Sequence, residues 1–465
     1  MARRTSTTPY PIDTGYAWVV LASCCVMRIL LDGFWTSLGI LFVNWEAYFG
    51  SSSSETSLIG SIFMMTLCAM APVSSVLVSR LSCRSVVVGA GICTFICCFA
   101  ASFITTFWHL YIIMTLLSLS MGMSYAPAYS CFIPYFDQHA ALAYMLSTAS
   151  TGIGLLAVPP LMEFLITHYS WQGALQINSA IMANICVCGI VLRPSPPKTI
   201  PIKSRKDRTE QKNVEFKILA QTDSSVKMSC FNFLHDLCAD FDLSLFRNVR
   251  FIFQAIIAGF FVGAIATYTI YLVPYAVSIG ISDFKASLLM LFYGVFIVVA
   301  RLSPISWMVD KKVISASTLG GIPFLILGCM VTFTPFVRTF THLVVVSAGY
   351  GIFQGIGFPM SLIVIAESPG DKKKAKGALA WYLIAYGLGC LICIFIAGYL
   401  YDLTGSYQYS LILCGIWTII TGAILLCDPF LIRWQSQLEK HHEECSSGKD
   451  RYTSLSSGNV EVTQV

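Results

Sequence analysis

Twelve runs of about 20 mostly apolar residues recur along the chain, each long enough to cross a lipid bilayer as a helix. They cover residues 18–43, 56–78, 85–106, 109–132, 141–166, 172–192, 251–278, 286–308, 313–335, 341–365, 377–400 and 408–431. Lipid offers the backbone no hydrogen-bond partner, so isolated spans of this length are helical. With 56% hydrophobic and 11% charged residues, the chain is predicted to be an all-α membrane protein rather than a soluble one.

The basic residues predict how these spans are oriented. If both termini are cytoplasmic, 25 of the 29 Lys and Arg residues fall on the cytoplasmic side, as the positive-inside rule requires. Lys285 and Arg338 then lie outside, and Arg28 and Arg301 lie within the membrane. The N-terminus has no short apolar region with a cleavage site, so the first span is expected to stay in the mature chain. We expect a multi-pass plasma-membrane protein.

Three stretches of the first half recur in the second half at offsets of 231 to 237 residues. The pairs are Arg80 with Lys311, residues 122–127 with 355–359, and residues 141–144 with 378–381. An even number of spans separates them, so the two halves are predicted to be parallel six-helix repeats. The predicted parts are the tail 1–17, the bundle 18–192, the cytoplasmic linker 193–250, the bundle 251–432 and the cytoplasmic tail 433–465.

Arg301 is the only charged residue in the apolar run from Leu288 to Met308. A charged side chain deep in a bilayer costs about 2.5–3.5 kcal/mol on insertion scales, so Arg301 is expected to have a partner or a function. It could be tied to helix carbonyls or to a nearby carboxylate. The alternative, which we favour, is that it binds an anion in an aqueous cavity.

The first span contains Arg28 and Asp32, four residues apart and so on one helical face. They either neutralise each other or belong to a polar lining at mid-depth. Gly and Pro interrupt the fourth and tenth spans, which points to a cavity there. Gly351 and Gly355 can equally serve close helix packing.

Other classes of protein have less support. None of the seven histidines lies well inside a span, and no pair of spans offers paired carboxylates or a Ser/His/Asp set. We therefore predict no enzyme, no metal site and no cofactor. Most of the 18 cysteines lie within spans, so no disulfide framework is expected. A receptor or scaffold of transporter shape stays open.

Two parallel six-helix repeats joined by a basic loop resemble the major facilitator superfamily, and two motifs resemble its monocarboxylate transporter family. The first motif lies before and at the start of the first span, and the second runs from the fourth span into the fifth. The matching residues are Asp13, Gly15, Trp18, Tyr135, Phe136, Leu142, Ala143 and Gly154. Thr14 departs from the first motif, and residues 138–140 replace the basic triplet of the second.

The resemblance implies alternating access, with a substrate site between the halves. Arg301 matches the arginine that binds the substrate carboxylate, and Phe358 matches an aromatic residue that sets pocket size. Proton-coupled members have an aspartate where this chain has Ile297, and a lysine where it has Thr36; Asp32 stands where a cavity tyrosine would be.

The candidate substrate-binding residues are therefore Arg301, Phe358, Asp32 and Thr36. The overall pattern is nearest to the creatine-type branch of the family. The departures favour facilitative transport of a small organic acid or zwitterion, with a proton-coupled monocarboxylate symporter as the alternative.

Two protein partners are predicted besides the small substrate and the bilayer. Thr463-Gln464-Val465 ends the sequence with the hydroxyl and apolar residues that PDZ domains bind by strand addition. The family resemblance also implies a single-span immunoglobulin-like ancillary glycoprotein. No nucleic-acid partner is expected.

Overall fold

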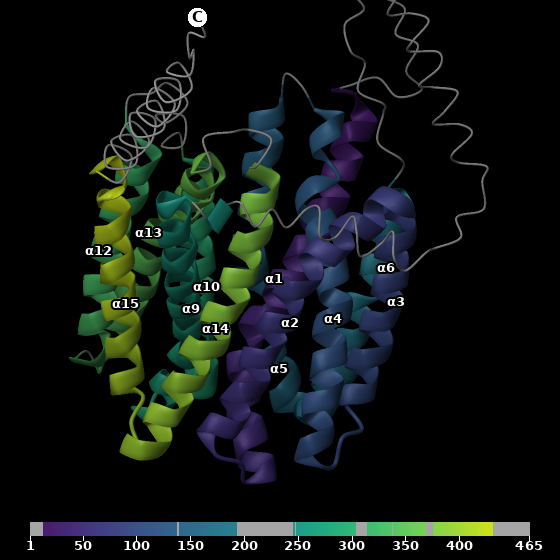
Figure 1. The fold of residues 1–465 in the computed structure, drawn as a ribbon. Coiled ribbons are helices and arrows are strands. Elements are labelled where there is room, and N and C mark those ends of the chain that lie inside the picture. The colour runs from purple at the N-terminus through teal and green to yellow at the C-terminus, as the bar shows by residue number, and fades with distance from the viewer. Residues whose placement is uncertain are drawn as a thin grey trace, which may run out of the picture.

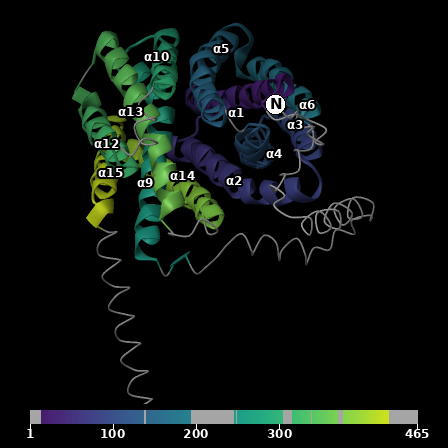
Figure 2. The same cartoon turned by 90° about the horizontal axis from the view of Figure 1, so that it is seen from above.

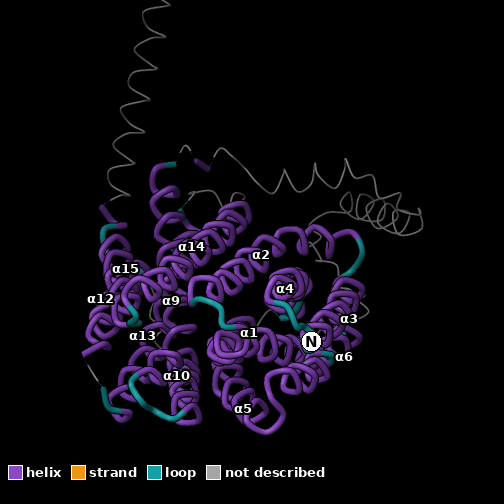
Figure 3. The backbone as a smooth tube through the Cα atoms, turned by 90° about the horizontal axis from the view of Figure 1, so that it is seen from below, coloured by secondary structure: helices purple, strands orange, loops and turns teal. Residues whose placement is uncertain are grey.

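A computed structural model describes residues 13–136, 139–192, 245–246, 248–303, 314–336, 338–368 and 375–430. These ranges form helices joined by short loops (Figure 3). The predicted PDZ-binding terminus at Thr463–Val465, the tail after residue 430 and most of the predicted linker lie outside the described residues.

The helices form two groups that lie side by side (Figures 1 and 2). One group is α1 (Gly15–Phe49), α2 (Ser53–Arg80), α3 (Cys83–Ala101), α4 (Phe107–Ser130), the 3₁₀ turn η1 (Ile133–Tyr135), α5 (Ala140–Met182) and α6 (Asn184–Val191). The other is α9 (Val249–Ser278), α10 (Asp283–Leu302), α12 (Ala316–Phe333), η3 (Thr334–Phe336), α13 (Phe340–Glu367), α14 (Ala375–Thr404) and α15 (Gln408–Leu426). Together they give the all-helical membrane fold that the sequence predicts.

The described residues contain 11 helical segments long and apolar enough to cross a membrane, one of which covers residues 142–191. A straight helix of that length would reach about 75 Å, far more than a hydrocarbon core of about 30 Å. Ser170 breaks the helix with φ 63° and ψ 170°. This break lies between the predicted fifth and sixth spans, so the long segment accounts for both of them.

Helix α10 is shorter than the span that the sequence predicts. The apolar run continues to residue 308, but α10 ends at Leu302, and Ser303 has an extended backbone with φ −68° and ψ 148°. A residue before proline is disfavoured in the helical region, and Pro304 follows Ser303. Arg301 therefore lies in the last turn of α10, nearer to a helix end than the sequence indicates.

Glycines let α5 of the first group and α13 of the second group approach α10 closely. A Cβ on Gly294 of α10 would lie 2.6 Å from the Gly152 carbonyl oxygen of α5. On α13, a Cβ on Gly351 would lie 2.5 Å from the Tyr293 carbonyl oxygen, and one on Gly355 would lie 2.7 Å from Cβ of Ala300. The packing role predicted for Gly351 and Gly355 is therefore confirmed, and it fixes α13 against α10.

One cysteine pair departs from the sequence prediction of no disulfide framework. Cys83 and Cys131 are joined by a disulfide in the structure. Cys83 opens α3 and Cys131 caps the end of α4. A five-residue loop joins the two helices at their other ends, so they run antiparallel and these two residues meet. Their separation of 48 positions hides this proximity in the sequence.

Candidate functional site

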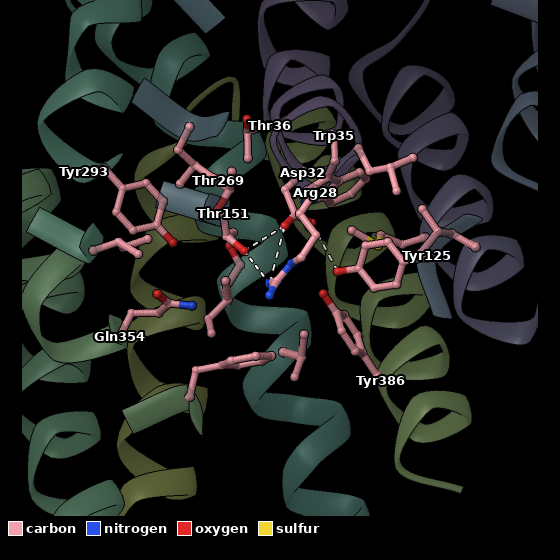
Figure 4. Close-up of a pocket in the computed structure, with 18 of the residues that line it drawn as sticks. Arg28, Asp32, Trp35, Thr36, Tyr125, Thr151, Thr269, Tyr293, Gln354 and Tyr386 are labelled. Carbon is pink, nitrogen blue, oxygen red and sulfur yellow. Dashed lines mark hydrogen bonds and ion pairs between the residues drawn. The ribbon is translucent and has the colours of Figure 1, made fainter. Parts of the chain in front are cut away.

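A cavity of about 70 Å³ lies between the two helix groups. Its wall comes from α1, α2, α4 and α5 on one side and from α9, α10, α13 and α14 on the other. The four residues predicted to bind substrate, Arg301, Phe358, Asp32 and Thr36, all line it. Figure 4 shows Arg28, Asp32 and Thr151 facing one another in its middle, with Gln354 and Tyr386 on opposite sides.

Arg301 reaches the cavity from α10, and its side chain is buried. Its Nη1 donates a hydrogen bond to the Thr148 carbonyl oxygen of α5 at 2.5 Å. Its Nε has no partner among the described residues. The guanidinium centre lies 6.0 Å from the centre of the Phe358 ring. Because a guanidinium has five N–H donors in a planar fork, most of its capacity is not used by this carbonyl.

Arg28 is held much more completely than Arg301. Its Nη1 donates to the Ser147 carbonyl oxygen at 2.6 Å, and its Nη2 donates to Thr151 Oγ1 at 2.5 Å and to Tyr129 Oη at 2.8 Å. Its guanidinium also lies 3.8 Å from the centre of the Tyr129 ring, where a cation is attracted to the π face. These contacts tie α1 to α4 and α5 and indicate a mainly structural role.

Asp32 accepts hydrogen bonds from both neighbouring helices. Thr151 Oγ1 donates to Oδ2 at 2.8 Å, and Tyr125 Oη donates to Oδ1 at 3.2 Å. Arg28 Nη2 lies 3.7 Å from Oδ2, so the predicted charge pair exists but is bridged by the Thr151 hydroxyl. Both readings of this pair hold, because the two residues neutralise each other and also line the cavity.

A glycine contact explains why Thr151 reaches Asp32. A Cβ on Gly154 of α5 would lie 2.7 Å from the Ile29 carbonyl oxygen and 3.1 Å from the Gly33 nitrogen of α1. Only glycine permits this approach, and Thr151 lies one turn before Gly154 on α5. The family-motif residue Gly154 thus sets the distance between the helices that hold the Arg28 and Asp32 network.

Thr36 and Ile297 also take the positions that the sequence predicts. The Thr36 hydroxyl donates to the Gly33 carbonyl oxygen of its own helix at 2.9 Å. Ile297 is buried and lines the cavity. Among the described residues of the lining, Asp32 is the only carboxylate.

Sequence reasoning missed several polar residues of the cavity. They are Tyr125, Tyr129, Thr151, Thr269, Tyr293, Gln354 and Tyr386. Tyr125 could have been found from the repeat, because it precedes Phe358 by the same number of residues as Gly122 precedes Gly355. The other six carry no charge and belong to no motif of the sequence, and only folding places them together.

The two family motifs meet at one end of the first helix group. The Asp13 nitrogen donates to the Tyr135 carbonyl oxygen at 3.0 Å, and the Trp18 ring packs edge-on against Phe136 at 5.1 Å. Gly15 begins α1. On α5, Ala143 is buried, whereas Leu142 is 45% exposed. All eight motif residues lie outside the lining of the cavity.

Solved structures of known transporters share this fold. A POT family transporter crystallised with 5-aminolevulinic acid superposes with a TM-score of 0.65 at 14% identity, covering 91% of this chain and 99% of that one. A POT peptide transporter crystallised with sulfate gives a TM-score of 0.67 at 13% identity over 91% and 97% of the two chains. At such low identity the likeness concerns the fold alone.

Sequence comparison identifies the family. The model of the Major Facilitator Superfamily matches residues 24–377 and 303–457. Monocarboxylate transporter 12 of Rattus norvegicus is 30% identical over 90% of this chain and 86% of its own length, and that of Mus musculus is 29% identical over the same shares. Monocarboxylate transporter 4 of Gallus gallus is 27% identical over 94% and 88%. The chain therefore belongs to the monocarboxylate transporter family of the major facilitator superfamily, and it is a secondary transporter.

Proposed function

We propose that this transporter moves a small organic acid or zwitterion across the plasma membrane by alternating access, without coupling to protons. The observation that carries the proposal is the state of Arg301 in the cavity between the helix groups. Its buried guanidinium has a single described hydrogen bond, to a carbonyl, and an unpartnered Nε. Such a group suits the bidentate binding of a carboxylate.

The charges of the cavity support an anionic group on the substrate. Arg28 and Asp32 compensate each other at 3.7 Å, which leaves Arg301 as the surplus positive charge among the described lining residues. A bound carboxylate would neutralise it. Asp32 already accepts from Thr151 and Tyr125, so it has limited capacity for the cationic end of a zwitterion. The cavity thus favours a net anion over a zwitterion, and both belong to the proposed class.

The lining also argues against proton coupling. Coupling needs a group whose protonation changes during the transport cycle and affects substrate affinity. Ile297, one turn before Arg301, cannot titrate. Asp32, the only carboxylate in the described lining, is already engaged by Arg28, Tyr125 and Thr151. The rival is that Asp32 itself carries the proton.

Uptake by cells expressing the protein tests this proposal. The panel is lactate, creatine, carnitine and phenylalanine, measured at fixed internal pH while the external pH is lowered in steps. We expect saturable uptake of at least one of them, with little dependence on external pH. A steep rise at low external pH that disappears in Asp32→Asn would establish proton coupling. Surface expression without uptake of any of the four would instead favour a receptor or scaffold.

The proposed orientation has both termini in the cytoplasm. It places the Cys83 and Cys131 end of the first group on the cytoplasmic side, where disulfides are kept reduced, so we expect the pair that is bonded in the structure to be two free thiols in cells. We expect both thiols to react in intact cells with a membrane-permeant maleimide and to be protected from an impermeant one. Labelling by the impermeant reagent would reverse the orientation.

Two partners belong to the proposal as well. A single-span immunoglobulin-like glycoprotein would support delivery to the surface, and a PDZ-domain protein would bind Thr463–Val465. Deleting Val465 is expected to abolish capture by PDZ domains. Unchanged capture and surface retention would contradict the second partner.

A further inference from the structure

Cys83 and Cys131 form the one disulfide among the described residues. They join the start of α3 to the end of α4, two helices that lie side by side in the first group (Figures 1 and 2). Both residues are partly exposed, whereas many of the free cysteines are buried within helices. The proposed orientation places the pair on the cytoplasmic side, where disulfides are as a rule transient and redox-sensing. The pair therefore has the position of a reversible contact.

Pro127 weakens the connection between the last turn of α4 and the rest of the helix. Proline has no backbone N–H, so the Met123 carbonyl oxygen loses its partner within the helix. It accepts instead from the Ser74 hydroxyl of α2 at 2.6 Å. The last turn is closed by a hydrogen bond from the Cys131 nitrogen to the Pro127 carbonyl oxygen at 2.9 Å. Its position therefore depends on its own contacts more than on the body of α4.

This last turn carries a residue of the cavity. Tyr129 lines the cavity and accepts a hydrogen bond from Arg28 Nη2 at 2.8 Å, and the guanidinium lies 3.8 Å from the centre of its ring. Cys131 follows two residues later, and the chain continues to Tyr135, whose carbonyl oxygen bonds to the backbone just before α1. The turn thus contacts α1, or the backbone next to it, on both sides of Cys131. The disulfide adds a covalent link to α3.

A link at this point bears on transport because the end of α4 lies where the two helix groups meet. Tyr129 lines the cavity together with Arg301 of α10 and Tyr386 of α14. Alternating access requires the contacts between the groups to change as the site opens to either side. A cross-link removes the conformations in which the joined residues are apart. Bonded to α3, the last turn of α4 loses freedom to adjust as the groups rearrange.

We propose that Cys83 and Cys131 are a reversible redox switch, in which hydrogen peroxide joins the two thiols, holds the end of α4 against α3 and slows transport. One thiolate attacks a peroxide oxygen, which gives a sulfenic acid and releases the other oxygen as water. The second thiol then displaces the sulfenic oxygen as a second water, and the S–S bond forms. The two sulfurs lose two electrons in total, which reduce the peroxide. Cytoplasmic thiols reverse the step by disulfide exchange. The switch rests on the proposed orientation.

Mass spectrometry of the full-length protein from cells tests whether the bond forms and breaks. Cells are left untreated, given hydrogen peroxide, or given peroxide and then dithiothreitol, and free thiols are blocked with N-ethylmaleimide before peptic digestion. We expect both thiols to be blocked in untreated cells, a linked Cys83–Cys131 peptide after peroxide, and blocked thiols again after dithiothreitol. A pair already bonded in untreated cells, or no linked peptide after peroxide, would overturn the switch.

Hydrogen exchange and uptake test what the bond does. In the purified protein, oxidation should slow amide exchange several-fold in residues 128–136 and leave α12 of the second group unchanged. Uptake of those compounds among lactate, creatine, carnitine and phenylalanine that cells expressing the wild type accumulate should fall several-fold after peroxide and recover after dithiothreitol. Uptake by Cys83→Ser and Cys131→Ser should resist peroxide. The control Cys93→Ser removes an exposed free cysteine of α3 and should respond as the wild type does.

An equal loss of uptake in Cys83→Ser and the wild type would overturn the role of the bond. Unchanged exchange and uptake in the presence of the linked peptide would do the same. If the wild-type protein takes up none of the four compounds, the proposed function fails. The linked peptide and the exchange rates need no substrate, so they decide the switch in that case as well.

Discussion

Removing either charge of the Arg28 and Asp32 pair should cost much more stability than removing both. The two groups lie 3.7 Å apart and both are buried, so their Coulomb attraction is about 4 kcal/mol at an effective dielectric constant of 20. Asp32→Asn leaves Arg28 buried without a countercharge, and Arg28→Met does the same to Asp32. Each single change should cost about 3–5 kcal/mol, because an uncompensated charge stays in the interior.

A double-mutant cycle measures this coupling. Unfolding of the purified protein in detergent, titrated with SDS, gives the apparent free energies of the wild type, both single variants and the double variant. We expect the double variant to be at least about 2 kcal/mol more stable than the sum of the single effects implies. Thr36→Val is the control, because its hydroxyl is bound within α1, and its effect should add to that of Asp32→Asn. Additive effects of Arg28→Met and Asp32→Asn would refute the pair and leave Asp32 available to substrate or proton.

Two further predictions concern the helix contacts. Gly154→Val should push α5 away from the Ile29 carbonyl oxygen, which should cost about 1–3 kcal/mol in stability and strongly reduce uptake. The control Gly89→Val places its side chain in open space and should change neither stability nor uptake. Equal thermal unfolding of the two variants would contradict this prediction. The carboxylate of Asp402 on α14 accepts hydrogen bonds from the backbone nitrogens of Ser53 and Ser54, the first two residues of α2, at 2.9 and 2.8 Å. Asp402→Asn should weaken this contact between the groups. We therefore expect it to speed maleimide labelling of the thiol in Ser57→Cys. Unchanged labelling, or the same increase in the control Glu55→Gln, would contradict it.

The helices were largely predictable because a bilayer requires spans of a certain length and low polarity, and both properties can be read from the residues of the sequence. The spans and the two-group layout follow from apolar runs, basic loops and the repeat. Helix ends were less predictable: α1 begins at Gly15 and continues to Phe49, and α10 stops at Leu302. Hydropathy reports where lipid contacts the chain, whereas the end of a helix depends on caps and on residues such as Pro304. The Cys83 and Cys131 contact depends on tertiary packing, which one sequence does not reveal.

The cavity was predictable where a residue contradicts its surroundings. Arg28, Asp32 and Arg301 are charged residues in apolar runs, so the free-energy cost of placing them in a bilayer identifies them as candidates for the site. Tyr129 and Gln354 are compatible with many positions in a membrane helix and become notable only through their neighbours. The hydroxyl of Thr151 has its role because Gly154 brings α5 against α1, and this depends on the packing of two helices far apart in sequence.

Carboxylate uptake by purified protein in liposomes tests most directly the claim that Arg301 binds the substrate. The wild-type protein, Arg301→Ala, Arg301→Lys and the control Arg338→Ala, which lies outside the cavity lining, are reconstituted in equal amounts. We predict saturable uptake by the wild type and Arg338→Ala, none by Arg301→Ala, and strongly weakened uptake by Arg301→Lys, because a point charge lacks the bidentate fork. Normal carboxylate uptake by Arg301→Ala would contradict the account and make Arg301 a structural residue.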